Sequence, residues 1–233
     1  MDVESPPVTA GGRAHREGRP MMPVGPILIL LLLVLAATGF LTGPLRRIGL
    51  SGRAALLLLA AMLLGSALEL RLAPRLTLNV GSGLLPALLS LYLLRTMRRW
   101  WEPLAAVGGA ANAAASLALI SLYFPPGLPT ELNLFYLDAQ YLYAAVAGTL
   151  GSVIGHTRPA SFAAAVWGSL AADVYHYLHY SGAGHGDIVH RMGGGGFHGT
   201  ALVAGVLALT LSELLQVGAP ERRAAAPPHL PTS

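Results

Sequence analysis

Long apolar stretches, separated by short polar or arginine-containing segments, dominate the hydrophobic pattern of this chain. Each stretch is close to the roughly 20 residues that a helix needs to cross the hydrocarbon core of a bilayer. The pattern predicts an all-α fold, a polytopic transmembrane bundle of about seven helices. Six is the alternative, because the second stretch is short and the fifth opens with polar residues. The expected spans are 23–41, 54–70, 76–94, 103–124, 134–155, 160–180 and 199–217.

The two ends of the chain lack this pattern. Residues 1–21 are polar and rich in Pro, Gly and Arg, and residues 218–233 are rich in Pro, Ala and Arg. Such compositions cannot bury enough apolar surface to fold, so we expect two disordered tails around one transmembrane helical domain at 22–217. The long first tail contains acidic residues, which favours an uncleaved first span over a cleaved signal peptide.

Composition also indicates a lipid environment. Hydrophobic residues make up 54% of the chain and charged residues only 11%, whereas a soluble domain carries about 25% charged residues. The chain has no cysteine, which excludes disulfides, thiolate zinc sites and a catalytic thiol. The net charge is +4, but the arginines lie in short clusters between apolar stretches, so nucleic acid is not an expected partner. The expected partner is the lipid bilayer, and homo-oligomerisation is left open.

Arginines set the predicted orientation, because cytoplasmic loops are enriched in basic residues. With seven spans, the N-terminus is predicted outside and the C-terminus in the cytoplasm, in a multi-pass protein of the prokaryotic inner (cytoplasmic) membrane. Trp100 and Trp101, beside Arg98 and Arg99, are typical of an interfacial anchor. The predicted inner side carries Arg46, Arg47, Arg53, Arg95, Arg98, Arg99, Arg158, Arg222 and Arg223, and the outer side Arg13, Arg16, Arg19, Arg71, Arg75 and Arg191.

Carboxylates and imidazoles gather near the opposite, outer ends of the predicted spans. Asp173, His176 and His179 repeat every three residues, which places them as a slanted stripe on one helix. Asp and neutral His suit zinc or a similar divalent ion. The alternative is a wet helix end, where His and Tyr are comfortable amphipathic residues. The candidate metal ligands are Asp173, His176, His179, His185, His190 and His198.

Asp173 is the hardest of these residues to dismiss, since it lies inside the sixth predicted span. A carboxylate that faces lipid costs roughly 2–3 kcal/mol on insertion scales, so Asp173 should face the bundle and find a partner or become protonated. An intramembrane ionisable residue is a functional hypothesis by default, and the alternative is a structural hydrogen bond between helices. The expected pocket-lining residues are Asn79, Asn112, Asp138 and Gln140.

The string Gly184-His185-Gly186-Asp187 spells GxGD, which resembles the second aspartate motif of the presenilin-like and prepilin-peptidase-like intramembrane aspartyl proteases. That chemistry needs two carboxylates that share a proton across a water molecule. The candidate catalytic residues are therefore Asp187 with Asp138 or Asp173. A four-residue motif is easily matched by chance, and the Tyr-Asp pair of the first motif of these proteases is absent.

Glycines mark places of close packing or broken helix. Asn79-Val80-Gly81-Ser82-Gly83, followed by Pro86, permits a broken or tightly packed helix with Asn79 as its cap. Gly151 and Gly155, and likewise Gly195 and Gly199, have the spacing that lets helix backbones approach each other.

The strings LTLNVGSGLLPALLSLYLL, YAAVAGTLGSVIG and GGGGFHGTALVAGVLALTL together resemble the prokaryotic membrane family labelled domain of unknown function 1614, over roughly residues 55–217. That family usually has an acidic residue where this chain has His198. The family has no established activity, so the resemblance implies only the fold and the membrane class.

These observations favour an integral membrane protein with an extracytoplasmic Asp- and His-rich pocket that binds or transports a cation, a proton or a small polar solute. An intramembrane or membrane-surface hydrolase, aspartyl or metal-dependent, is the second hypothesis, and a metal would activate water there. The third is a structural membrane protein with incidental histidines. The sequence favours a binding role over an enzyme.

Overall fold

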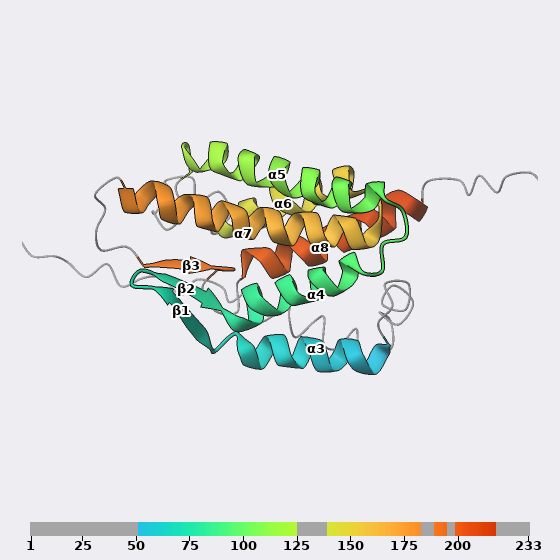
Figure 1. Cartoon of the computed structure of the whole chain (residues 1–233), viewed down its shortest axis with the longest axis horizontal. Helices are drawn as coiled ribbons and strands as arrows, with labels where there is room; N and C mark the ends of the chain where they lie inside the picture. The colour runs from blue at the N-terminus through green and yellow to red at the C-terminus, as the bar shows by residue number, and fades with distance from the viewer. Residues whose placement is uncertain (1–50, 125–138, 183–188, 195–198, 218–233) are drawn as a thin grey trace, which may run out of the picture.

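A computed structural model describes residues 51–124, 139–182, 189–194 and 199–217 of the chain. In these ranges the protein is mostly helical, with a small sheet at one end of the helices (Figure 1). The helices are α3 (Gly52–Gly65), the π-helix η1 (Val80–Leu84), α4 (Leu85–Leu94), α5 (Trp101–Ser121), α6 (Ala139–Gly155), α7 (Arg158–Gly182) and α8 (Thr200–Val217). The strands are β1 (Glu69–Ala73), β2 (Leu76–Asn79) and β3 (His190–Met192).

Helix α7 lies at the centre of the packing and contacts α4, α5, α6 and α8. Small side chains allow this, because close helix approach needs little side-chain bulk at the contact. A Cβ atom at Gly155 would lie 2.4 Å from the backbone nitrogen of Ser161, and one at Gly151 would lie 2.9 Å from the Cβ of Ala165. The packing role predicted for this glycine pair is therefore confirmed.

The sheet joins segments that are far apart in the sequence. Strands β1 and β2 form an antiparallel hairpin, and β3 pairs with β2 in parallel, with Leu76 opposite His190. The backbone N–H of His190 also donates to the carbonyl of Arg75 at 2.9 Å. This pairing holds β3, which follows α7 in the sequence, against β2, which precedes α4.

Asn79 organises the passage from sheet to helix. Its side-chain amide donates to the carbonyl of Ser66 at 2.8 Å. Its Oδ1 accepts from the backbone N–H of Ser82 at 2.9 Å and from the Ser82 hydroxyl at 2.8 Å. Strand β2 thus passes into the π-helix η1 and then into α4, with Pro86 in the first turn of α4. The predicted cap at Asn79 and the irregular helix after it are confirmed.

The prediction of an all-α bundle of about seven spans is wrong. The second expected span, 54–70, ends as a helix at Gly65 and continues as strand β1. At 1.5 Å per residue the 14 residues of α3 reach about 21 Å, less than the roughly 30 Å of a hydrocarbon core. The third, 76–94, begins as β2 and leaves only ten residues for α4. Among the described residues, α5 is the one helix long and apolar enough to cross a membrane.

The same finding overturns the multi-pass inner-membrane placement and the orientation that depended on it. The expected separation of arginines from carboxylates and imidazoles holds only in part. Arg158 begins α7, and Asp173 and His176 lie toward its other end. Arg75 and Arg191, which were already expected on the same side as the histidines, lie at the sheet beside His190. The first expected span and both tails fall outside the described residues.

Candidate functional site

One face of α7 brings together Asp173, His176 and Tyr180. Spacings of three and seven residues return side chains to nearly the same side of a helix. His176 is only 3% exposed, and Asp173 and Tyr180 keep partial exposure. His179 is exposed on another side of the helix. The predicted stripe therefore divides, with Asp173 and His176 turned into the protein and His179 toward its surface.

Asp173 is held by the backbone just after β3. The N–H of Gly193 donates to its Oδ2 at 2.7 Å. Gly193 has a φ of +81°, which favours glycine. A Cβ atom there would also lie 2.6 Å from the Cα of Gly83 in η1. The close approach of η1 to the end of β3 thus aims this N–H at α7.

Tyrosines surround the imidazoles of His176 and His190. The ring of His176 lies 6.0 Å from that of Tyr143 on α6 and 6.2 Å from that of Tyr180. Tyr180 stacks on His190 of β3, with ring centroids 6.1 Å apart and planes at 15°. The Tyr143 hydroxyl donates to the carbonyl of Phe124. The Nε2 atom of His176 is buried and has no hydrogen-bond partner in the described ranges.

The electrostatics of this cluster disfavour charge on both Asp173 and His176. Burial of the carboxylate raises the pKa of Asp173 to about 7, against the lowering effect of the Gly193 hydrogen bond. Burial also lowers the pKa of His176 to about 4, with added repulsion from His190 and His179. Burial lowers the pKa of His190 and, with Tyr180 and Asp173 nearby, raises that of Tyr143. Desolvation opposes the charged form of each group.

The expected pocket-lining residues have different positions. Asn79 is buried, but both ends of its amide are engaged within the sheet-to-helix junction. Asn112 is exposed on α5, and its pocket-lining role stays a prediction. Gln140 lies partly buried at the start of α6, where its pocket role stays a prediction. Asp138 lies outside the described residues.

The metal hypothesis stays a prediction. In the described ranges no group of three or more His, Asp or Glu side chains is placed to hold a metal ion. Asp173, His176, His179 and His190 are within these ranges, and the further candidates His185 and His198 are outside them. Asp173 and His176 supply one carboxylate and one imidazole nitrogen, which suit a small cation or a proton.

The catalytic candidates cannot be paired within the described part of the chain. Asp173 is the one member of the three whose position is described, since Asp138 and Asp187 lie outside these ranges. Its carboxylate has a backbone N–H as its hydrogen-bond partner. An aspartyl mechanism needs a second carboxylate beside it.

Sequence reasoning missed Tyr143, Tyr180 and Gly193 as members of this cluster. The tyrosines belong to the runs YLYAA and DVYHYLHY. Spacing was a usable signal for Tyr180, because it follows His176 by four residues and residues four apart are neighbours on a helix. Tyr143 and Gly193 gave no comparable signal, because their contacts with α7 depend on how separate segments of the chain pack.

No protein family, curated protein or solved structure matches this chain. The resemblance to the family labelled domain of unknown function 1614 therefore stays a prediction.

Proposed function

We propose that the cluster around Asp173 and His176 binds a proton or a small cation, and that the protein acts as a binding module for that ion. The observation that carries the proposal is a partly buried carboxylate, held by the N–H of Gly193, three residues from a buried imidazole nitrogen that has no partner in the described ranges. An unneutralised carboxylate in such a place favours uptake of a positive charge.

The surroundings suit a small positive ion. His176 stays neutral at ordinary pH because its pKa is about 4, so one of its two ring nitrogens carries a lone pair that can accept. The rings of Tyr143 and Tyr180 lie 6.0 and 6.2 Å from the His176 ring, and tyrosine rings can attract a cation through their faces. A carboxylate, a neutral imidazole and two aromatic rings together favour a cation over an anion.

Binding of a cation should release a proton. Asp173 has a pKa of about 7, so below that pH a cation must displace the proton from the carboxyl group. We expect the affinity for the cation to fall about tenfold for each pH unit below 7 and to level off above it. A proton alone is the simplest ligand that fulfils the same role.

Calorimetric titration with zinc, manganese and nickel chlorides, on both sides of pH 7, tests the proposal. Asp173→Asn keeps the side-chain shape and an acceptor for Gly193 but removes the charge. The matched control is Glu69→Gln, which removes a carboxylate that lies 3.6 Å from Arg191 on the sheet. We expect Asp173→Asn to abolish binding and Glu69→Gln to leave it unchanged.

The proton is tested separately by following the Asp173 carboxyl carbon by NMR through a pH titration. A midpoint near 7, with no cation bound, would support the proton as the ligand. No cation binding together with an Asp173 midpoint near its ordinary value of 3.8 would overturn the proposal.

A further inference from the structure

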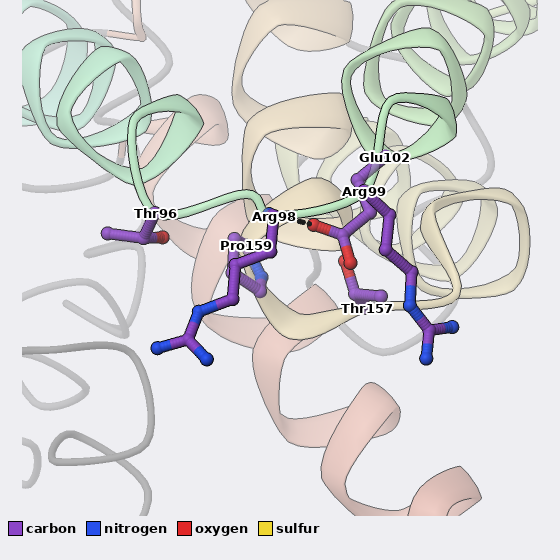
Figure 2. Close-up of a pocket in the computed structure, with 6 residues that line it drawn as sticks. All are labelled: Thr96, Arg98, Arg99, Glu102, Thr157 and Pro159. Carbon is purple, nitrogen blue, oxygen red and sulfur yellow. Dashed lines mark hydrogen bonds between the residues drawn. The ribbon is translucent and has the colours of Figure 1, made fainter.

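The end of the molecule opposite the Asp173 cluster has a surface hollow of about 370 Å³ (Figure 2). The linker between α4 and α5, the first turn of α5 and the start of α7 form its walls. Its lining residues are Thr96, Arg98, Arg99, Glu102, Thr157 and Pro159.

The hollow carries two guanidinium groups that are not neutralised by a carboxylate within the described ranges. Arg98 and Arg99 are both exposed, and in Figure 2 their guanidinium groups extend to either side, away from the Glu102 carboxylate. That carboxylate instead accepts from the backbone N–H of Arg98 at 3.1 Å. The Arg99 guanidinium lies 5.9 Å from the centre of the Trp101 ring. The positive charge of both arginines is therefore available to an anion.

A hydroxyl group adds a polar atom to the same hollow. The Oγ1 of Thr157 is buried and has no hydrogen-bond partner in the described part of the chain. Thr157 precedes α7 and lines the hollow. A buried hydroxyl without a partner is costly, and an anion's oxygen would accept a hydrogen bond from it.

An apolar surface begins directly beside the hollow. Trp100 is 81% exposed, Leu104 61% and Val107 67%. The outward side of α5 continues with small or apolar residues, Asn112 being its polar exception. Its exposed positions are Pro103, Leu104, Val107, Gly108, Ala111, Asn112, Ala115 and Leu119. Basic groups and a tryptophan next to an apolar helix face match the boundary between phosphate headgroups and acyl chains.

We propose that this corner binds an anionic phospholipid. The guanidinium groups of Arg98 and Arg99 and the Thr157 hydroxyl hold the phosphate of the headgroup in the hollow. The acyl chains lie along the outward side of α5, over Leu104 and Val107. Charge complementarity selects an anionic lipid over a neutral one, because the hollow carries two arginines against the single carboxylate of Glu102, which accepts from the backbone N–H of Arg98.

Native mass spectrometry of the full chain in neutral detergent, with phosphatidylglycerol or phosphatidylcholine added, tests the proposal. We expect the wild type to retain phosphatidylglycerol in preference to phosphatidylcholine. Arg98→Gln/Arg99→Gln should weaken that retention about 10- to 30-fold. Thr157→Val keeps the side-chain shape and removes the hydroxyl. Its effect on phosphatidylglycerol retention should be several-fold smaller than that of the double arginine variant.

The matched control is Arg71→Gln/Arg75→Gln, which removes the same charge from exposed positions at the sheet end. Circular dichroism checks that each variant is folded. Retention of both lipids alike by the wild type, or equal loss in the two double variants, would overturn the proposal. Inorganic phosphate that binds to the hollow without any retained lipid would show a soluble-anion site and overturn it as well.

Discussion

The two ends of α7 place charged groups in different surroundings. Near its start, Arg158 forms two hydrogen bonds with Glu213 of α8, from Nε to Oε1 at 2.5 Å and from Nη2 to Oε2 at 2.9 Å. Toward its other end, Asp173 receives a backbone N–H in place of a cation. An arginine beside a carboxylate favours the charged form, whereas a carboxylate held by a backbone N–H alone is more sensitive to protons and to cations.

The difference extends to packing. The sheet end is closed by backbone segments in direct contact, where η1 meets β3 and the end of α3. The other end is open, with a hollow between two exposed arginines. We therefore expect substitutions at the sheet end to act mainly on folding and pH response, and those at the open end to act mainly on binding at the surface.

The largest effect should come from Gly81→Ala at the sheet end. A Cβ atom there would lie 2.0 Å from the carbonyl oxygen of Met62 and 2.4 Å from the backbone nitrogen of Ser66. Backbone atoms cannot move aside as a side chain can, so we expect a loss of at least about 3 kcal/mol in the free energy of unfolding. Denaturant titration followed by circular dichroism measures it.

Gly108→Ala on α5 is the control, since nothing lies within 4 Å of a Cβ atom there. We expect it to be neutral or to stabilise the protein by up to about 1 kcal/mol, because alanine favours a helix more than glycine does. If the two variants were equally stable, the sheet end would not be as closely packed as described.

The next effect concerns the pH dependence of stability. The folded pKa of Asp173 is about 7 against an ordinary 3.8, so stability falls as the pH rises from about 4 to 7. The folded pKa of His176 is about 4 against an ordinary 6.5, so stability falls as the pH drops from 6.5 to about 4. In the shared range the folded chain keeps one proton and the unfolded chain keeps one, so the two contributions offset each other.

Replacing one of the two residues should reveal the pH dependence of the free energy of unfolding that the other one contributes. In Asp173→Asn the free energy of unfolding should rise with pH between about 4 and 6.5 by up to about 1.4 kcal/mol per unit, relative to the wild type. In His176→Gln it should fall by a similar amount. Urea unfolding at a series of pH values measures both. Two variants that keep the wild-type profile would show that neither group is desolvated.

The smallest effect should come from the ion pair at the other end. Both side chains are about one-fifth exposed, 21% for Arg158 and 20% for Glu213, so solvent screens their attraction. A double-mutant cycle with Arg158→Gln and Glu213→Gln should give a coupling energy of about 1 kcal/mol. A coupling energy of several kcal/mol would contradict this prediction, because it would show that solvent does not screen the pair.

Local patterns predicted the parts of this molecule that depend on neighbouring residues. Asn79 was predicted to cap a helix that Gly81, Gly83 and Pro86 permit to be broken, and the hydrogen bonds from Ser82 agree. The strand Glu69–Ala73 was missed because ELRLA continues an apolar stretch, and its pairing with β2 decides its conformation. Hydropathy averaged over a stretch does not separate a strand from the end of a helix.

The candidate site was predicted less completely. Asp173 and His176 were chosen from their spacing and from the cost of a carboxylate in an apolar stretch. Their actual partners, Gly193 and Tyr143, come from other segments. Contacts of this kind depend on how the segments pack. Apolar helices of similar composition can pack in several ways, so the sequence alone does not determine these contacts.

The parallel pairing of β2 with β3 also sets an order of assembly. Leu76 can pair with His190 only after the chain has passed through α4, α5, α6 and α7. Closing so long a loop carries an entropic cost, which the β2–β3 contacts offset only once they have formed. During synthesis the edge of β2 that will pair with β3 therefore stays unpaired until β3 has been made. We expect the hydrogen bond from Gly193 to Asp173 to be among the last contacts to form and among the first to exchange amide hydrogen with solvent.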